Sequence, residues 1–282
     1  MENKMIIDGK QIAEKILDDV ASKVKALSYK PLFCDILVGD DQVSASYVRL
    51  KGLAAERVGF AFDFVHMPTN TSTEELVEKI ATLQNEPTLA GLIVQLPLPD
   101  HLDLDEVLNA IDPEVDVDCI GTESNTAFYQ DKTAMIPPTA GAILYILDTL
   151  PEDLSSKRVL VIGQGELVGK PITHLLKKRG LQVTIADRST ENLASITPHA
   201  DIIICGTGQP GLLYGSMVKQ GAIVIDAGTA ESGGGIVGDV EFESVLPVAS
   251  YISPVPGGVG PVTVAKLLEN VYLTAKAKNI HP

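Results

Sequence analysis

The stretch VLVIGQGELVGKP, residues 159–171, decides the fold of this chain. Its first four residues are apolar and are typical of a buried strand in a parallel sheet. Gly163 permits a tight turn with backbone angles that other residues avoid, and Gly165 leaves the backbone bare. The helix that follows would offer unpaired N–H groups and a partial positive charge, which attract a phosphate. We interpret the stretch as a dinucleotide site, with a purely structural strand–turn–helix as the alternative.

Two features of this stretch bear on the choice of dinucleotide. The glycines at 163, 165 and 169 are spaced GxGxxxG, one residue longer than the usual GxGxxG pattern. Asp187 ends the next predicted strand, where an acidic residue binds a ribose hydroxyl and favours NAD. Arg188 and Ser189 follow at once, and an arginine there could hold the 2′-phosphate of NADP. The two signals conflict.

Predicted strands and helices alternate along the whole chain, which indicates an α/β fold. A first series of elements ends near residue 118, and a second series, which contains the glycine loop, begins near residue 139. A long helix at the end of the sequence is long enough to pack back on the first series. We therefore expect two domains, residues 1–138 completed by the helix 262–282, and residues 139–261.

Composition excludes several classes of protein. The formal net charge of −15 disfavours binding to nucleic acids, whose phosphates would be repelled. No apolar run reaches the ~18 residues that a membrane-spanning helix needs, and the start MENKMIIDGKQIAEKI lacks the profile of a secretory signal. Cys34, Cys119 and Cys205 form no CxxC pair, which argues against a zinc site or a disulfide scaffold. We expect a cytoplasmic protein that binds neither nucleic acid nor membrane.

Several residues of the first series could carry chemistry. Tyr47 and Lys51 lie four positions apart on a predicted helix and so face one way. A lysine partly removed from water can work as an acid or base near neutral pH. Gln95 interrupts an apolar strand near its carboxyl end, where α/β sheets place ligands. Asp116 and Asp118 point the same way if their segment is extended, and a carboxylate can hold two parallel N–H groups of a heterocycle.

Each of these residues also has a structural interpretation. The tyrosine and lysine could belong to the surface of an amphipathic helix, the amide could be satisfied by local backbone, and the acidic segment could be a solvated turn. A metal site in that segment is not expected, because no histidine or further ligand lies at a supporting spacing. The stretch SPVPGGVGPVT, residues 253–263, combines glycines with prolines in a stiff frame that suits gripping a ligand, with a plain turn as the alternative.

Taken together, these stretches resemble the bifunctional methylenetetrahydrofolate dehydrogenase/cyclohydrolases of the FolD type over nearly the whole length. The motifs that carry the resemblance are YVRLK (47–51), GLIVQLPLP (91–99), PEVDVD (113–118), IGQGELVGKP (162–171), GAIVIDAG (221–228), GDV (238–240) and PVPGGVGPVTVA (255–266). The resemblance implies two domains around a cleft: a three-layer α/β catalytic domain, and a Rossmann-like NAD(P)-binding domain whose following helix packs back on the first. It also implies a folate substrate, NADP (or NAD) as cofactor, no metal, and a homodimer.

The resemblance implies oxidation of 5,10-methylenetetrahydrofolate to the methenyl compound, then hydrolysis to 10-formyltetrahydrofolate. Lys51 would be the central catalytic group, positioned by Gln95, while Tyr47 would stack on the folate and Asp118 would grip the pterin edge. The expected substrate contacts are Tyr47, Asp118, Pro256, Gly257, Gly258, Pro261 and Thr263. The expected cofactor contacts are Gly163, Gln164, Gly165, Val168, Gly169, Asp187, Arg188, Ser189, Gly206, Thr207, Gly208 and Thr229.

The chain departs from the family pattern in its cofactor loop. Gln164 and Gly165 replace an arginine and a serine that help to hold the 2′-phosphate, and PPTAGA (137–142) replaces the usual PCTPxG. Two alternatives therefore stay open: a cyclohydrolase with weakened or lost dehydrogenase activity, and a catalytically dead folate or nucleotide sensor. A short-chain-type dehydrogenase also uses YxxxK, but its glycine loop precedes that pair, whereas here the loop follows it.

Overall fold

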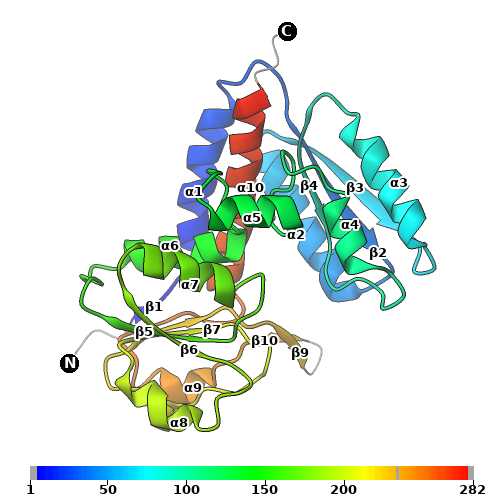
Figure 1. Cartoon of the computed structure of the whole chain (residues 1–282). Coiled ribbons are helices and arrows are strands. Elements are labelled where there is room, and N and C mark those ends of the chain that lie inside the picture. Colours follow the sequence, from blue (N-terminus) through cyan, green and yellow to red (C-terminus); the bar gives the residue numbers. More distant parts are fainter. Residues whose placement is uncertain (1–4, 233–234, 279–282) are drawn as a thin grey trace. The chain divides into compact units, whose positions relative to one another are not determined.

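The computed structural model describes residues 5–232 and 235–278, which form two compact units (Figure 1). Unit 1 contains residues 5–13 and 139–263, and unit 2 contains residues 14–138 and 264–278. Within these described ranges, no helix combines the length and the apolar character needed to cross a bilayer.

Unit 2 is built on a three-stranded parallel sheet in the order β3-β2-β4. The strands are β2 (Leu32–Val38), β3 (Ala61–Met67) and β4 (Leu89–Val94). Side chains alternate along β2, so Cys34, Ile36 and Val38 point to one face. They pack there against apolar side chains of α3 (Thr73–Gln84) and α4 (Leu104–Asn109). Phe33, Asp35 and Leu37 consequently point to the opposite face.

The helices of unit 2 begin where the sequence provides caps. Asp41 accepts a hydrogen bond from the Ser44 N–H at 2.6 Å and so starts α2 (Gln42–Val58). Ser72 starts α3 with a capping box that includes Glu75. The remaining helices of this unit are α5 (Thr122–Tyr129) and the larger parts of α1 (Gly9–Val24) and α10 (Val259–Lys278).

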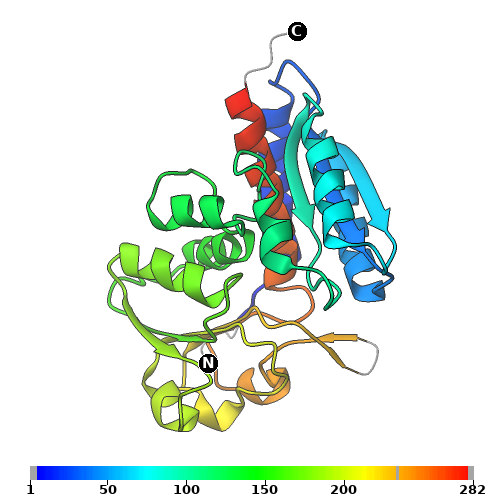
Figure 2. The same ribbon diagram turned by 45° about the vertical axis from the view of Figure 1, so that its right-hand side comes forward.

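The C-terminal helix α10 lies beside α1, as the sequence analysis expects (Figures 1 and 2). The ammonium of Lys23 on α1 lies 5.8 Å from the ring centre of Tyr272 on α10. On β4, a Cβ atom at Gly91 would lie 2.8 Å from Val271 Cγ2, so the glycine lets α10 pack closely on the sheet. The last helix is therefore part of the core of unit 2.

Unit 1 is a parallel six-stranded sheet in the order β1-β11-β8-β7-β5-β6, with helices on both faces. The helices α6 (Pro138–Thr149) and α7 (Gly169–Lys178) lie on one face, and α8 (Leu193–Ile196) and α9 (Phe242–Val245) lie on the other (Figures 1 and 2). The strands are β1 (Met5–Ile6), β5 (Arg158–Ile162), β6 (Gln182–Ala186), β7 (Ile202–Cys205), β8 (Ile223–Asp226) and β11 (Tyr251–Ile252). A separate antiparallel pair joins β9 (Ala230–Ser232) to β10 (Gly235–Val237).

The start of the chain differs from the expectation. The sequence analysis places residues 1–138 in one domain, but β1 pairs in parallel with β11, so residues 5–13 belong to unit 1. A strand of two residues carries no periodic pattern, and its partner lies near the other end of the sequence. The α/β class and the Rossmann-like sheet are as the sequence predicts.

Candidate functional site

A buried ion pair in unit 2 brings together residues from two strands and a helix. The Nζ atom of Lys51, on α2, lies 2.9 Å from Oδ2 of Asp35, on β2. The side chain of Lys51 is 9% exposed and that of Asp35 is 0% exposed. Gln95, just after β4, donates from Nε2 to Oδ1 of Asp35 at 2.9 Å. Asp35 therefore links the amide of Gln95 to the ammonium of Lys51.

The two oxygens of Asp35 are engaged differently. Oδ1 accepts a hydrogen bond from Gln95. Oδ2 lies 2.9 Å from Nζ of Lys51 and forms the ion pair with it. Burial raises the pKa of the Asp35 carboxyl, and the nearby Lys51 ammonium opposes that rise.

The sequence explains why α2 can bring its lysine so close to the sheet. Lys51 is followed by Gly52, in the middle of the helix, where glycine is normally unfavourable. A Cβ atom at this position would lie only 2.5 Å from Cε1 of Phe62 on β3. The glycine therefore allows the helix to rest against the sheet, with Lys51 directed at the face of β2 that carries Asp35.

Sequence reasoning missed Asp35. It reads the stretch around this residue as an ordinary strand, although a lone carboxylate within FCDILV was a usable signal. Charged side chains are almost never fully buried unless they are paired. The pattern thus implied a buried cation nearby, but it could not say which one.

Asp118 lies at the same site and is partly exposed. Burial raises the pKa of Asp118 to about 7; the Lys51 ammonium opposes the rise, whereas Asp116 and Asp35 add to it. The carboxyl therefore changes its charge in the neutral pH range. The next residue, Cys119, has a positive φ of 59°, which marks a sharp turn of the chain directly after Asp118.

Asp116 does not share the orientation of Asp118 that an extended segment would give. The segment is a turn, in which the Asp116 carboxylate is buried and accepts hydrogen bonds from Ile120 N at 3.1 Å and Gly121 N at 2.8 Å. It also accepts one from the hydroxyl of Ser124. All three donors, which lie at and before the start of α5, bond to Oδ2, so this oxygen holds the turn.

Tyr47 lies one helical turn before Lys51 on α2 and is half-buried. Burial raises the pKa of its phenol. The i, i+4 spacing places both side chains on one side of the helix, as the sequence predicts. Unit 2 thus brings Tyr47, Lys51, Gln95 and Asp118 together with Asp35, which was not expected.

In unit 1, the order of the strands creates a switch point beside β5. The strand that follows β5 in the sequence, β6, lies on one side of it, and β7 lies on the other. In sheets of this kind, ligands bind outside the carboxyl ends of the strands at the switch point. The glycine loop follows β5 at this place, and the loop that starts at Gly206 follows β7.

The glycines of these loops lie where other residues would not fit. Gly163 has φ +97°, and a Cβ atom there would lie 2.4 Å from the carbonyl oxygen of Gly206. A Cβ atom at Gly169 would lie 1.9 Å from the carbonyl oxygen of Gly163, so the start of α7 packs directly on the loop. At Gly165, by contrast, a Cβ atom would meet nothing within 4 Å. The tip of the loop is therefore bare backbone facing open space.

This cradle fits a dinucleotide. Within the described ranges no side chain caps the N-terminus of α7. Lys170 N donates to the carbonyl oxygen of Gly165 at 3.1 Å and Pro171 has no N–H, so the N–H of Gly169, at the positive end of the helix, is the group of the first three residues left for a pyrophosphate. The side-chain amide of Gln164 is hydrogen-bonded within the loop, where Nε2 donates to the carbonyl oxygen of Gly163 at 2.8 Å. Thr207 is held by Asp239 Oδ2, which accepts from its N–H at 2.6 Å and from its hydroxyl at 2.9 Å. Gly208 lies near Thr229, whose carbonyl oxygen would be 3.6 Å from a Cβ atom at the glycine.

The residues after β6 lie beside this loop, since Gly163 N donates to the carbonyl oxygen of Ala186 at 2.8 Å. The carboxylate of Asp187 is exposed and accepts from the N–H of Ser189 at 2.8 Å and from its hydroxyl at 2.6 Å. These bonds lower the pKa of Asp187. Arg188 is exposed, and no ion pair engages it within the described part of the chain.

The predicted substrate loop lies in unit 1 and packs against the start of α1. Gly257 has a positive φ of 105°, and its carbonyl oxygen accepts from Gly9 N at 3.0 Å. Pro256 is exposed, and Gly258 N donates to the carbonyl oxygen of Pro254 at 2.9 Å. Pro261 and Thr263 lie in the first turns of α10 and are half-buried.

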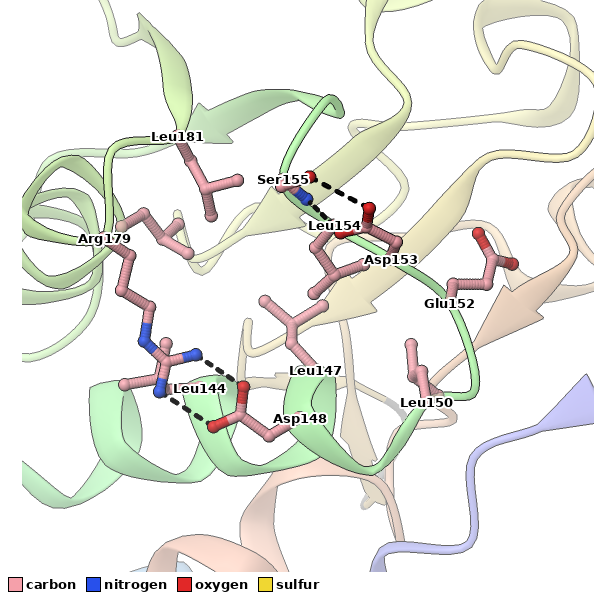
Figure 3. A pocket seen from close by; sticks show the side chains of 11 residues that line it. Leu144, Leu147, Asp148, Leu150, Glu152, Asp153, Leu154, Ser155, Arg179 and Leu181 are labelled. Carbon is pink, nitrogen blue, oxygen red and sulfur yellow. Dashed lines mark hydrogen bonds and ion pairs between the residues drawn. The ribbon is translucent and has the colours of Figure 1, made fainter.

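A pocket of about 290 Å³ in unit 1 lies elsewhere on the sheet (Figure 3). Leucines line it together with Arg179 and Asp148, whose Nη2 and Oδ2 atoms lie 2.8 Å apart. Residues 150–155 of its wall lead into β5 and Leu181 leads into β6, so the pocket lies at the amino ends of these strands. Since the glycine loop lies at their carboxyl ends, this pocket is not the candidate site.

No metal site accompanies the two clusters: among residues 5–232 and 235–278, no three or more His, Cys, Asp and Glu are placed to hold an ion together. The three cysteines are free and buried.

Comparisons with known proteins assign both units to the same protein family. Residues 7–118 match the family described as tetrahydrofolate dehydrogenase/cyclohydrolase, catalytic domain, and residues 137–279 match its NAD(P)-binding domain. The chain is 41% identical to the bifunctional protein FolD of Lactobacillus acidophilus over 277 residues, which cover 97% of this chain and 98% of that protein.

Solved structures give the same result. The bifunctional enzyme FolD of Campylobacter jejuni is 36% identical with a TM-score of 0.92, over 98% of this chain and 99% of that one. The FolD enzyme of Trypanosoma brucei, complexed with NADP and an inhibitor, is 35% identical with a TM-score of 0.93 over the same shares.

Proposed function

Because the chain belongs to the tetrahydrofolate dehydrogenase/cyclohydrolase family, it acts as a methylenetetrahydrofolate dehydrogenase and methenyltetrahydrofolate cyclohydrolase, and we propose that Lys51 carries the hydrolysis. The observation that supports this role is the placement of its ammonium, 9% exposed, at 2.9 Å from a buried carboxylate. A charged lysine kept out of water at a fixed position is suited to exchange protons with a substrate.

The chemistry of the folate defines what Lys51 has to do. In the methenyl compound, a cationic carbon bridges two nitrogens and its charge is spread over the N–C–N unit. Water adds to this carbon and loses one proton, which leaves a hydroxyl group on the carbon. One C–N bond then breaks as its nitrogen gains a proton, and the hydroxyl loses its proton to solvent as the C=O bond of the formyl group forms on the other nitrogen. Lys51 takes the proton from water as an amine and returns one to the leaving nitrogen as an ammonium. Gln95 supports it through Asp35.

We propose that Asp118 and Tyr47 hold the folate. The pterin ring presents neighbouring N–H groups on one edge, and an ionised carboxylate can accept both in parallel. Asp118 is the partly exposed carboxyl of this cluster, whereas Asp116 is occupied in its turn. The half-buried ring of Tyr47 offers a flat surface on the same side of α2 for stacking. The loop 253–263 would contribute Pro256, Gly257, Gly258, Pro261 and Thr263.

Unit 1 is an NAD(P)-binding domain, and when bound the nicotinamide accepts the hydride in the oxidation. The residues that would hold the dinucleotide are the loop 163–169, the first turn of α7 and the loop 206–208 with Thr229. Hydride loss from the methylene carbon gives a cation that the adjacent nitrogens stabilise, so this step needs alignment rather than a strong base.

We propose NADP as the preferred dinucleotide, with NAD as the alternative. The exposed guanidinium of Arg188 supports a 2′-phosphate, and the relative from T. brucei was solved with NADP. The carboxylate of Asp187 opposes it, because it would repel that phosphate. We further propose a cytoplasmic homodimer, for which light scattering should give twice the 30.0 kDa of one chain.

Replacement of Lys51 by methionine tests the proposed role. K51M should lower the rate of methenyltetrahydrofolate hydrolysis by about 100-fold or more, because the proton-transfer group is gone. Folate affinity should stay close to that of the parent protein. Arg49→Met removes an exposed cation from the same helix and serves as the matched control. Hydrolysis by K51M within about tenfold of the parent rate would reject the role of Lys51.

A further inference from the structure

We propose that Asp35 is a positioning residue for hydrolysis, whose buried carboxylate fixes Nζ of Lys51 and sets the pH range in which hydrolysis runs. This inference rests on the proposed function, since it assumes that Lys51 carries the proton transfers.

The placement of Asp35 in the fold makes it a rigid anchor. It lies in the middle of β2, the central strand of its sheet, where it is paired in register with Phe64 of β3 and Ile93 of β4. Ladder hydrogen bonds on both sides hold such a backbone firmly, and groups built on strands are placed more accurately than groups on loops. The ammonium of Lys51 lies at the end of a long, flexible side chain and is held 2.9 Å from the Asp35 carboxylate.

The residue type at this position also needs an explanation. Its neighbours Phe33, Cys34, Ile36 and Leu37 are all apolar and buried, so a valine or isoleucine would continue the apolar pattern of the strand. A carboxylate with no exposure is instead unfavourable unless it is paired and hydrogen-bonded. Asp35 meets that need through the ion pair with Lys51 and the bond from Gln95, both on the side of the sheet that α2 covers.

The charges that surround Lys51 come from three directions. Asp35 faces it from β2, and Asp118 faces it from the turn before α5, with Asp116 behind in the same turn. Gln95 after β4 and Tyr47 on α2 add polar groups that are neutral at physiological pH. In the proposed function the Asp118 carboxylate is engaged by the pterin, so Asp35 is the carboxylate left to Lys51 when the substrate is bound.

This arrangement has a consequence for pH dependence. A carboxylate at ion-pair distance favours the ammonium form of a lysine over the amine form. The attack of water requires the amine, so loss of the Asp35 charge should make the reactive form accessible at lower pH. Oxidation of the methylene compound needs no base and should not share this dependence.

The test compares the pH profiles of Asp35→Asn and of the parent enzyme. Asparagine keeps the shape of the side chain and removes its charge. The acid-side midpoint of kcat for methenyltetrahydrofolate hydrolysis should move down by about one pH unit or more. The plateau of kcat should fall about tenfold because Nζ is no longer held, while KM changes little.

A second neutral variant controls for misfolding of Asp35→Asn. Asp35→Val continues the apolar pattern of β2 and should show the same shift of the midpoint. Asp35→Glu restores the charge and should return the midpoint toward the parent value, even if kcat stays lower. Thermal unfolding and the dehydrogenase rate of each preparation report on the fold.

The outcomes separate the two proposals. If K51M is inactive in hydrolysis but neither neutral Asp35 variant moves the midpoint, Asp35 is not the positioning residue and the role of Lys51 stands. Equal losses of hydrolysis and dehydrogenation without a shift mean that Asp35 is merely structural, which also overturns the inference. If K51M still hydrolyses the substrate within about tenfold of the parent rate, the proposed function itself fails.

Discussion

The side chain of Asn270 links the C-terminal helix to two loops of unit 2 by hydrogen bonds, and its removal should lower the free energy of unfolding. Asn270 lies on α10 and is 4% exposed. Its Nδ2 donates to the carbonyl oxygens of Val117 and Ile136, both at 2.8 Å, and its Oδ1 accepts from Ile136 N at 3.4 Å. Asn270→Ala deletes two good hydrogen bonds and leaves the Val117 carbonyl buried without its donor. At about 1 kcal/mol for each bond and a further ~1 kcal/mol for the unpaired carbonyl, the free energy of unfolding should fall by about 3 kcal/mol.

Urea denaturation measures this loss. Thr274→Val is the matched control, because Thr274 lies one turn further along α10 and its hydroxyl makes a weak contact, 3.5 Å from the sulfur of Met135. The control should cost less than about 1 kcal/mol. Val117 directly precedes Asp118, so Asn270→Ala should also weaken folate binding more than dinucleotide binding. A loss in Asn270→Ala below about 1 kcal/mol, or one equal to that of the control, would refute the reasoning.

Two further predictions concern ligand affinity. Because the pKa of Asp118 is raised to about 7, the ionised form that accepts N–H groups is lost as pH falls through that value. The dissociation constant of tetrahydrofolate, measured by fluorescence, should be about tenfold larger at pH 6 than at pH 8 in the parent protein. The Asp118→Asn variant should bind weakly at both pH values. A dissociation constant of the parent that does not change with pH would contradict this prediction. Asp187→Ser removes the carboxylate that is proposed to face the ribose, and it should raise the ratio of kcat/KM for NADP over NAD by about tenfold. Steady-state rates that leave this ratio unchanged would show that Asp187 does not select the cofactor.

The parts of the molecule that the sequence predicted are those specified by local chemistry. The glycines at 163 and 169 had to precede a helix because their spacing and the apolar run before them allow little else, and the structure places both at points of close backbone contact. The pairing of Tyr47 with Lys51 followed from the periodicity of one helix.

The parts that escaped prediction depend on contacts between distant segments. Asp35 forms an ion pair with Lys51 on a helix and accepts a hydrogen bond from Gln95, which follows another strand. No local sequence pattern identifies these partners. A shared orientation of Asp116 and Asp118 was expected only for an extended segment, and this segment turns instead. The strand β1 is too short to show any period, and only the exposed edge of β11 determines where it pairs.

The pairing of β1 with β11, together with the position of α10, affects how the protein is made on the ribosome. Unit 1 takes its edge strand β1 from residues that precede all of unit 2, and unit 2 takes the larger part of its closing helix from residues that follow all of unit 1. The nascent segment Leu32–Val94 can form its three strands early, but the apolar surface at Gly91 that α10 covers stays open until residues 264–278 have been made. Unit 1 has its complete set of elements once residue 263 is reached, so loss of residues 264–278 would leave the core of unit 2 open.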